Sequence, residues 1–221
     1  MEAILPKEIL PEKKYVHPLL KLPANFFSYI FHPIFVPLYS IVFLVYVHPS
    51  YFSGFSAKEK LYTVLISGYN LIFYPLLSIV LLKAVGFIDS VFLRTKRDRI
   101  IPYMACGIFF FWAYTVFKKQ DMYPPIMPAF ILGVFLAASA GLIANIYYKV
   151  SMHAIGMGGW LGLFLVVAKS NTMLMTWPFA LVLLCTGITC TARLIVSDHT
   201  EKDIYTGLAI GLLSQFIAAA V

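Results

Sequence analysis

The segment Ile126–Tyr147, which reads IMPAFILGVFLAASAGLIANIY, decides the fold class of this chain. It holds no charged side chain. A helix advances about 1.5 Å per residue, so about 20 apolar residues cross the roughly 30 Å hydrocarbon core of a bilayer. The apolar residues are continuous, whereas the strands of a membrane barrel alternate apolar and polar residues. The segment therefore predicts a transmembrane helix.

Six further apolar runs flank this segment and set the architecture. They cover residues 26–47, 61–82, 102–117, 154–168, 173–190 and 204–221. The runs at 102–117 and 154–168 are short for a full crossing. We predict an all-α, polytopic transmembrane bundle of six to seven membrane helices. The chain has no internal repeat and no long linker, so residues 26–221 are expected to form a single domain.

Residues 1–25 differ from the rest of the chain. They are polar, hold Lys7, Lys13, Lys14 and Lys21, and are broken by four prolines. A signal peptide has a clean apolar core followed by a small-residue cleavage site, and this stretch has neither. We expect a polar or interfacial tail ahead of the membrane domain.

The overall composition also places the chain in the bilayer. Of 221 residues, 61% are hydrophobic and 12% are charged, whereas soluble domains are about half apolar and about a quarter charged. This excludes a soluble enzyme, a disordered chain and a nucleic-acid module. The net charge of +7 comes from basic residues in short gaps, which is typical of topology signals, headgroup contacts or a phosphate site. Cys106, Cys185 and Cys190 lie in apolar runs and predict no disulfide framework.

Three gaps between the runs concentrate ionisable side chains and form the candidate site. The first (94–102) holds Arg94, Lys96, Arg97 and Arg99, the second (149–153) holds Ser151 and His153, and the third (193–203) holds Arg193, His199 and Asp203. Two runs separate each gap from the next, so all three face one side of the membrane if every run crosses. The remaining histidines, His17, His32 and His48, are expected to be interfacial.

The first two gaps fit a phosphate site, and both also fit a structural role. Arginine supplies planar, paired donors to phosphate oxygens, and lysine adds a point charge. Four basic side chains within residues 94–99 also make a positive-inside loop. A serine such as Ser151 can hold a phosphate, and His153 can transfer a proton near neutral pH. Both residues equally suit the polar start of a helix.

The third gap contains a histidine and a carboxylate four residues apart. This spacing predicts that His199 and Asp203 share one helix face. A carboxylate on one ring nitrogen fixes the tautomer and leaves the other nitrogen available as a nucleophile. The structural alternative is an ion pair at a solvated helix end. No further cluster of His, Cys or carboxylates completes a metal site in the sequence, so we expect neither a metal nor a cofactor.

The third gap resembles a signature of the type 2 phosphatidic acid phosphatase / vanadium haloperoxidase superfamily. That signature places a histidine six residues after an arginine and an aspartate four residues later. Arg193, His199 and Asp203 match it, and Ala192 stands where the family has a leading serine.

The other two gaps resemble the remaining family motifs less closely. The Pro-Ser-Gly-His motif keeps Ser151 and His153 but loses its proline and glycine. The Lys-x6-Arg-Pro motif is matched loosely, with Arg99 two residues too early for Pro102 and with Lys96 or Arg94 in place of its lysine.

The resemblance spans residues 94–210 and implies a metal-independent phosphohydrolase, in a family that usually has six membrane helices. It implies that His199 is a nucleophile that forms a phosphohistidine, that Asp203 orients it, and that His153 protonates the leaving oxygen. The phosphate contacts that it implies are Arg193, Arg99, Lys96 and Ser151, and the neighbouring Arg94 and Arg97 are further candidates for phosphate binding.

The expected function is hydrolysis of a lipid phosphomonoester or pyrophosphate. Candidate substrates are phosphatidate, phosphatidylglycerophosphate and isoprenyl pyrophosphate. The expected partners are this phosphorylated lipid and the bilayer, with no nucleic acid. The alternative is a non-catalytic membrane protein that binds or transports anionic lipid through a basic pocket. Few polar residues lie inside the runs, which disfavours a transporter.

We expect the protein in a bacterial inner membrane, and two arguments about its orientation conflict. Twelve of the 17 Lys and Arg residues lie on the side of the three gaps, which favours a cytoplasmic site. Bacterial members of the resembled family usually face outward.

Overall fold

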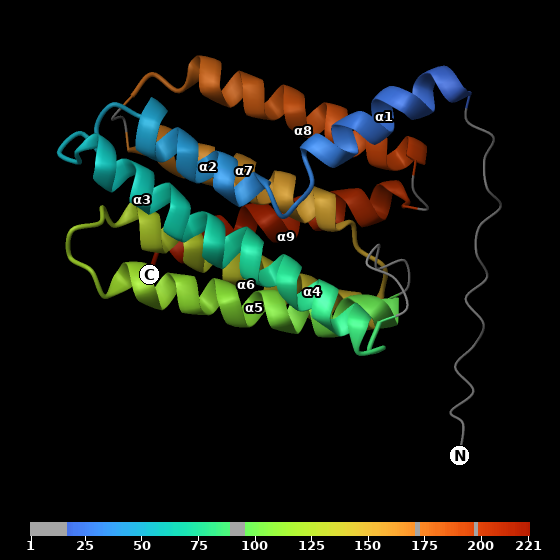
Figure 1. Ribbon diagram of the computed structural model, residues 1–221. Coiled ribbons are helices and arrows are strands. Elements are labelled where there is room, and N and C mark those ends of the chain that lie inside the picture. The colour runs from blue at the N-terminus through green and yellow to red at the C-terminus, as the bar shows by residue number, and fades with distance from the viewer. Residues whose placement is uncertain (1–16, 89–95, 171–172, 197–198) are drawn as a thin grey trace.

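The computed structural model describes residues 17–88, 96–170, 173–196 and 199–221, and of residues 96–99 the backbone only (Figure 1). Within these ranges the ordered elements are helices, and no strand occurs. They are α1 (Pro18–Ile30), α2 (Val36–Val42), η1 (Phe43–Val47), α3 (Ala57–Gly68), η2 (Tyr69–Phe73), α4 (Tyr74–Ala84), α5 (Lys96–Lys118), α6 (Ile126–Tyr147), α7 (Met152–Lys169), α8 (Thr176–Val196) and α9 (Glu201–Ala219). The prediction of an all-α helical bundle is confirmed.

Five of the described helices are long and apolar enough to cross a membrane. They are Ala57–Ala84, in which α3, η2 and α4 are continuous, then Ile100–Lys118, Ile126–Tyr147, Met152–Lys169 and Thr176–Val196. The two other predicted runs correspond to the shorter apolar helix Val36–Val47 and to α9, whose first turn carries Glu201 and Asp203. The described helices fit an integral membrane protein.

The first apolar run is divided into two helices. α1 ends at Ile30 and α2 begins at Val36, and His32 and Pro33 lie in the turn between them. A proline disfavours helical backbone at the residue before it, so Pro33 interrupts a run whose hydropathy is continuous. The 26–47 run is therefore not one membrane helix. α1 instead lies beside α8 at one end of the bundle (Figure 1).

α7 forms the centre of the bundle. It contacts α2, α6, α8 and α9, while α5 packs on α6 and α4 packs on α5. Figure 1 shows these helices running along a common axis. Many of the α7 side chains are buried, including Met157, Leu163 and Val167.

α7 and α9 approach until their backbones touch. A Cβ atom at Gly158 would collide with the carbonyl of Leu208, and one at Gly211 would collide with the carbonyl of Ile155. Small residues allow such close approach between membrane helices. A Cβ at Gly207 would likewise lie 2.9 Å from the carbonyl oxygen of Ser151. We call these glycines the α7–α9 seam, and they fix the distance between the starts of the two helices.

Candidate functional site

The starts of α5, α7 and α9 and the end of α8 lie at the same end of the bundle (Figure 1). This is the arrangement expected from an even number of helices between the three gaps. The second and third gaps are in direct contact, because the backbone N–H of Ser151 donates to the carbonyl oxygen of Asp203 at 3.4 Å.

The first gap is described only in part. Lys96, Arg97 and Arg99 form the first turn of α5, and their backbone alone is described. Arg94 lies outside the described residues. The phosphate contacts predicted for these four side chains therefore stay predictions.

His199 and Asp203 lie together at the start of α9. Nδ1 of His199 is 3.5 Å from Oδ2 of Asp203, and the two side chains are only 5% and 14% exposed. A carboxylate at Nδ1 favours a proton there and leaves the lone pair on Nε2. The geometry thus suits an oriented imidazole.

The pair does not arise from a shared helix face as the spacing predicted. α9 begins at Glu201, and the N-cap Thr200 has extended backbone, so His199 precedes the helix. Asp203 accepts from the backbone N–H of Thr200 at 2.9 Å, and Oγ1 of Thr200 accepts from the backbone N–H of Asp203 at 3.3 Å. The same carboxylate caps the helix and faces the imidazole.

His153 is held by the N-terminal helix. Its Nε2 lies 3.0 Å from the carbonyl oxygen of Ser28 in α1. A carbonyl oxygen only accepts, so Nε2 carries the proton and Nδ1 is the nitrogen with the lone pair in the neutral ring. Arg193, His32 and His199 are all close enough for their charges to act on His153. The second and third gaps therefore share one electrostatic site.

Ser151 is fully buried and is the N-cap of α7. Its Oγ accepts from the backbone N–H of Ala154 at 3.4 Å. Capping satisfies one of the backbone donors left over at a helix start. The hydroxyl proton is not used in this bond, and the predicted contact to phosphate stays a prediction.

A cavity of about 650 Å³ opens beside this site. Its polar lining comes mainly from the motif end of the bundle and includes Asn25, Ser28, His32, His153 and Arg193. The other lining residues come from α2, α4, α5, α6, α7 and α9 and are largely apolar, with Ser40 and Gln215 among the polar exceptions. Along α7 the wall reaches Trp160, about 10 Å beyond His153 at the α-helical rise. The cavity thus combines a cationic end with an apolar interior.

Not every predicted site residue lines this cavity. His153 and Arg193 do, whereas His199, Asp203 and Ser151 are not among its lining residues. Arg193, in the last turn of α8, is half-buried.

His32 is a site residue that the sequence reasoning missed. It lines the cavity, and its ring meets that of His153 edge to face, with centroids 5.3 Å apart at 81°. Burial, and next the charge of Arg193, lower the pKa of His32 to about 4. The ring is therefore neutral at pH 7.

No sequence signal distinguishes His32 from the other histidines expected at the interface. His17, His32 and His48 each precede a proline, and the Nδ1 of each accepts a backbone N–H two residues later, at 3.4, 3.4 and 3.3 Å. Only the packing of the α1–α2 turn against α7 places His32 in the cavity.

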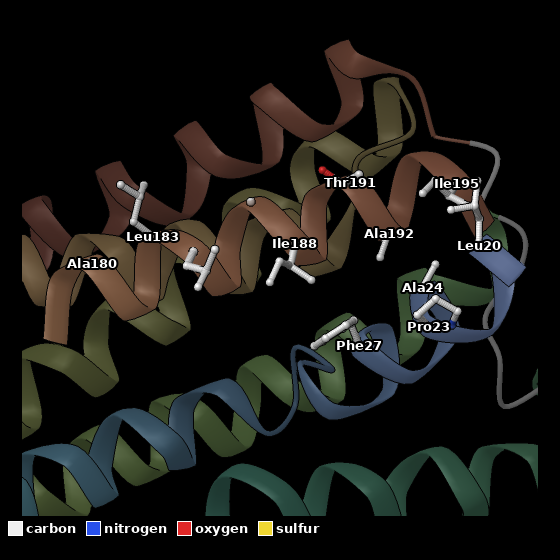
Figure 2. A pocket seen from close by; sticks show the side chains of 12 residues that line it. Leu20, Pro23, Ala24, Phe27, Ala180, Leu183, Ile188, Thr191, Ala192 and Ile195 are labelled. Carbon is white, nitrogen blue, oxygen red and sulfur yellow. The ribbon is translucent and has the colours of Figure 1, made fainter. Parts of the chain in front are cut away.

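A second cavity, of about 700 Å³, lies between α1 and α8 (Figure 2). Its lining is almost entirely apolar, with Pro23, Ala24 and Phe27 on α1 facing Ile188 and Ala192 on α8. Ala192 directly precedes Arg193. An apolar groove therefore runs along the outside of the helix that carries the site arginine.

Among the described residues no group of three or more His, Cys, Asp or Glu side chains could hold a metal ion. Comparison of the chain with protein-family models, with curated proteins and with solved structures gives no match.

Proposed function

We propose that the protein is an integral-membrane lipid phosphatase that hydrolyses a lipid phosphomonoester or pyrophosphate through a phosphohistidine. One observation supports this most: the 650 Å³ cavity has His153 and Arg193 at one end and largely apolar walls beyond them. A lipid phosphate has the same division, with a charged head and an apolar tail. Phosphatidate, phosphatidylglycerophosphate and isoprenyl pyrophosphate all fit this description.

The proposed first step is attack on phosphorus by Nε2 of His199. The carboxylate of Asp203, 3.5 Å from Nδ1, supports the positive charge that develops on the ring. Arg193 stabilises the charge on the phosphoryl oxygens in the transition state, as fixed cationic donors do in other phosphoryl transfers. The contacts predicted for Ser151 and for Arg94, Lys96, Arg97 and Arg99 belong to the same proposal.

The proton for the leaving oxygen comes from His153 in this scheme. Because Nε2 of His153 donates to the carbonyl of Ser28, the transferred proton is carried on Nδ1, so this step starts from the doubly protonated, cationic ring and leaves the neutral ring. Water then attacks the phosphohistidine, His153 takes up a proton from that water, and inorganic phosphate leaves.

One observation favours the alternative, a non-catalytic anionic-lipid binding protein. The side chain of His199 is only 5% exposed and does not line the cavity. In this alternative His153 and Arg193 hold the lipid headgroup and no covalent step follows.

The deciding experiment measures phosphate release from a panel of lipid phosphates by the purified full-length protein in detergent micelles. We expect turnover by the unchanged protein and its loss in His199→Ala. The matched control is His48→Ala, because His48 is also a buried histidine but is the C-cap of η1, at the far end of the α2–η1 helix from His32. Lipid phosphate binding without phosphate release would favour the alternative, and full turnover by His199→Ala would exclude the phosphohistidine.

A further inference from the structure

The cavity end contains two imidazole rings, and their N–H groups have different surroundings. His153 donates from Nε2 to a backbone carbonyl at 3.0 Å. His32 accepts the backbone N–H of Ile34 at Nδ1, at 3.4 Å. A neutral imidazole carries one proton, so the proton of His32 is on Nε2, the nitrogen at the far edge of the ring from the turn.

The ring that carries this N–H lines the cavity. His32 lines the same cavity as Arg193, and its ring lies against that of His153. Two cavity-lining groups at this end, the Arg193 guanidinium and the Nε2–H of His32, are hydrogen-bond donors of the kind that bind phosphoryl oxygens. A neutral donor also contributes a hydrogen bond without adding a further charge to a site walled by apolar helices.

We propose that His32 is a phosphoryl-contacting residue, whose Nε2–H donates to an oxygen of the bound phosphate beside Arg193. This inference rests on the proposed function, and it adds a contact from a segment outside the three sequence motifs. The low pKa of His32 agrees with it, because a ring that stays neutral keeps Nδ1 as the acceptor for Ile34 and Nε2 as the donor.

Two amide substitutions distinguish the acceptor role of Nδ1 from the donor role of Nε2. In His32→Asn the amide oxygen can accept the backbone N–H two residues later, as Asn commonly does in turns, but the donor at the Nε2 position is lost. In His32→Gln the longer amide restores an N–H donor near the Nε2 position, and the short turn acceptor is lost. His48→Asn and His48→Gln are matched controls, because His48 makes the same hydrogen bond, to Ser50, in the turn that follows η1.

The experiment measures three quantities for each variant of the full-length protein: kcat on short-chain phosphatidate, the dissociation constant of inorganic vanadate, and the melting temperature. We expect His32→Asn to lower kcat and to weaken vanadate binding, each by about 10²–10³-fold, the usual effect of removing one fixed donor to transition-state charge. We expect His32→Gln to stay within about tenfold of the unchanged protein in both quantities. The His48 variants should leave kcat and vanadate affinity unchanged.

Three other outcomes would overturn the inference, and a fourth would overturn only the proposed function. If His32→Gln loses activity and His32→Asn keeps it, the role of His32 is to accept the hydrogen bond within the turn. If both variants lose turnover of phosphatidate but keep vanadate affinity, His32 is a proton donor and not a phosphoryl contact. If both variants keep turnover and affinity, His32 has no part in the site. If the unchanged protein releases no phosphate but its vanadate affinity depends on His32 as expected, the phosphatase proposal fails and the anion contact stands.

Discussion

The α7–α9 seam makes a sharp prediction about Gly211. In Gly211→Ala the new Cβ would meet the carbonyl oxygen of Ile155, with backbone atoms of Gly158 and Gly159 also in close contact. None of these atoms can rotate away as a side chain does, so the two helices must separate. Overpacking of this kind costs about 1–3 kcal/mol, and the helical preference of Ala over Gly offsets about 0.5–1 kcal/mol of it.

Gly187 supplies a control for which the expected change in stability has the opposite sign. In Gly187→Ala, in the interior of α8, the new Cβ would have no atom within 4 Å. Only the helical preference then acts, and the free energy of unfolding should rise by about 0.5–1 kcal/mol. For a chain of this size 1 kcal/mol corresponds to roughly 2–4 °C in melting temperature.

The assay is thermal unfolding of both variants in the same detergent. Gly211→Ala should melt up to roughly 10 °C below the unchanged protein and Gly187→Ala roughly 1–4 °C above it. Separation of α7 from α9 should also lower any turnover by Gly211→Ala. A Gly211→Ala protein that melts at or above the temperature of Gly187→Ala would refute the close backbone contact.

Three further predictions concern acid, the aspartate and the oxyanion. His32 takes up a proton near pH 6.5 in the unfolded chain but only near pH 4 in the folded protein. The free energy of unfolding should therefore fall by up to about 3 kcal/mol as the pH drops from about 6.5 to about 4. Melting curves of His32→Gln should lack this contribution to the loss of stability. Asp203→Asn should keep the helix cap, because an amide oxygen still accepts from Thr200. It should nevertheless lower kcat by about ten- to 10⁴-fold, which is a smaller loss than that expected for His199→Ala. A kcat equal to that of the unchanged protein would contradict the orienting role of Asp203. Vanadate should compete with the lipid phosphate for the site. Turnover should survive EDTA, because the proposed cations are side chains such as Arg193. Turnover that is lost in EDTA and restored by Mg²⁺ or Zn²⁺ would favour a metal-assisted mechanism.

Hydropathy predicted the helical architecture well because each bilayer-crossing helix is a continuous apolar run. α6 has the predicted bounds, Ile126–Tyr147. The same signal failed at Pro33, since a turn flanked by phenylalanines is as apolar as a helix. Only the backbone restriction of a proline marks that break.

The chemistry of the site was predictable in part. The spacing of His199 and Asp203 predicted their contact, now seen at 3.5 Å, but not that Asp203 also caps α9. The place of His32 depends on how the α1–α2 turn packs against α7. That packing joins residues more than a hundred positions apart, and no local pattern in the sequence encodes it.

The hold of α1 on His153 has a practical consequence for truncation and tagging. A chain shortened to begin at Val36 would retain all five long helices, and by hydropathy it would insert as the full protein does. It would nevertheless lack the Ser28 carbonyl that holds His153 and the ring of His32 beside it. Correct insertion is therefore a poor test of an intact site. A bulky fusion placed directly before α1 should disturb ligand binding more than one placed after α9, because α9 ends at the opposite end of the bundle (Figure 1).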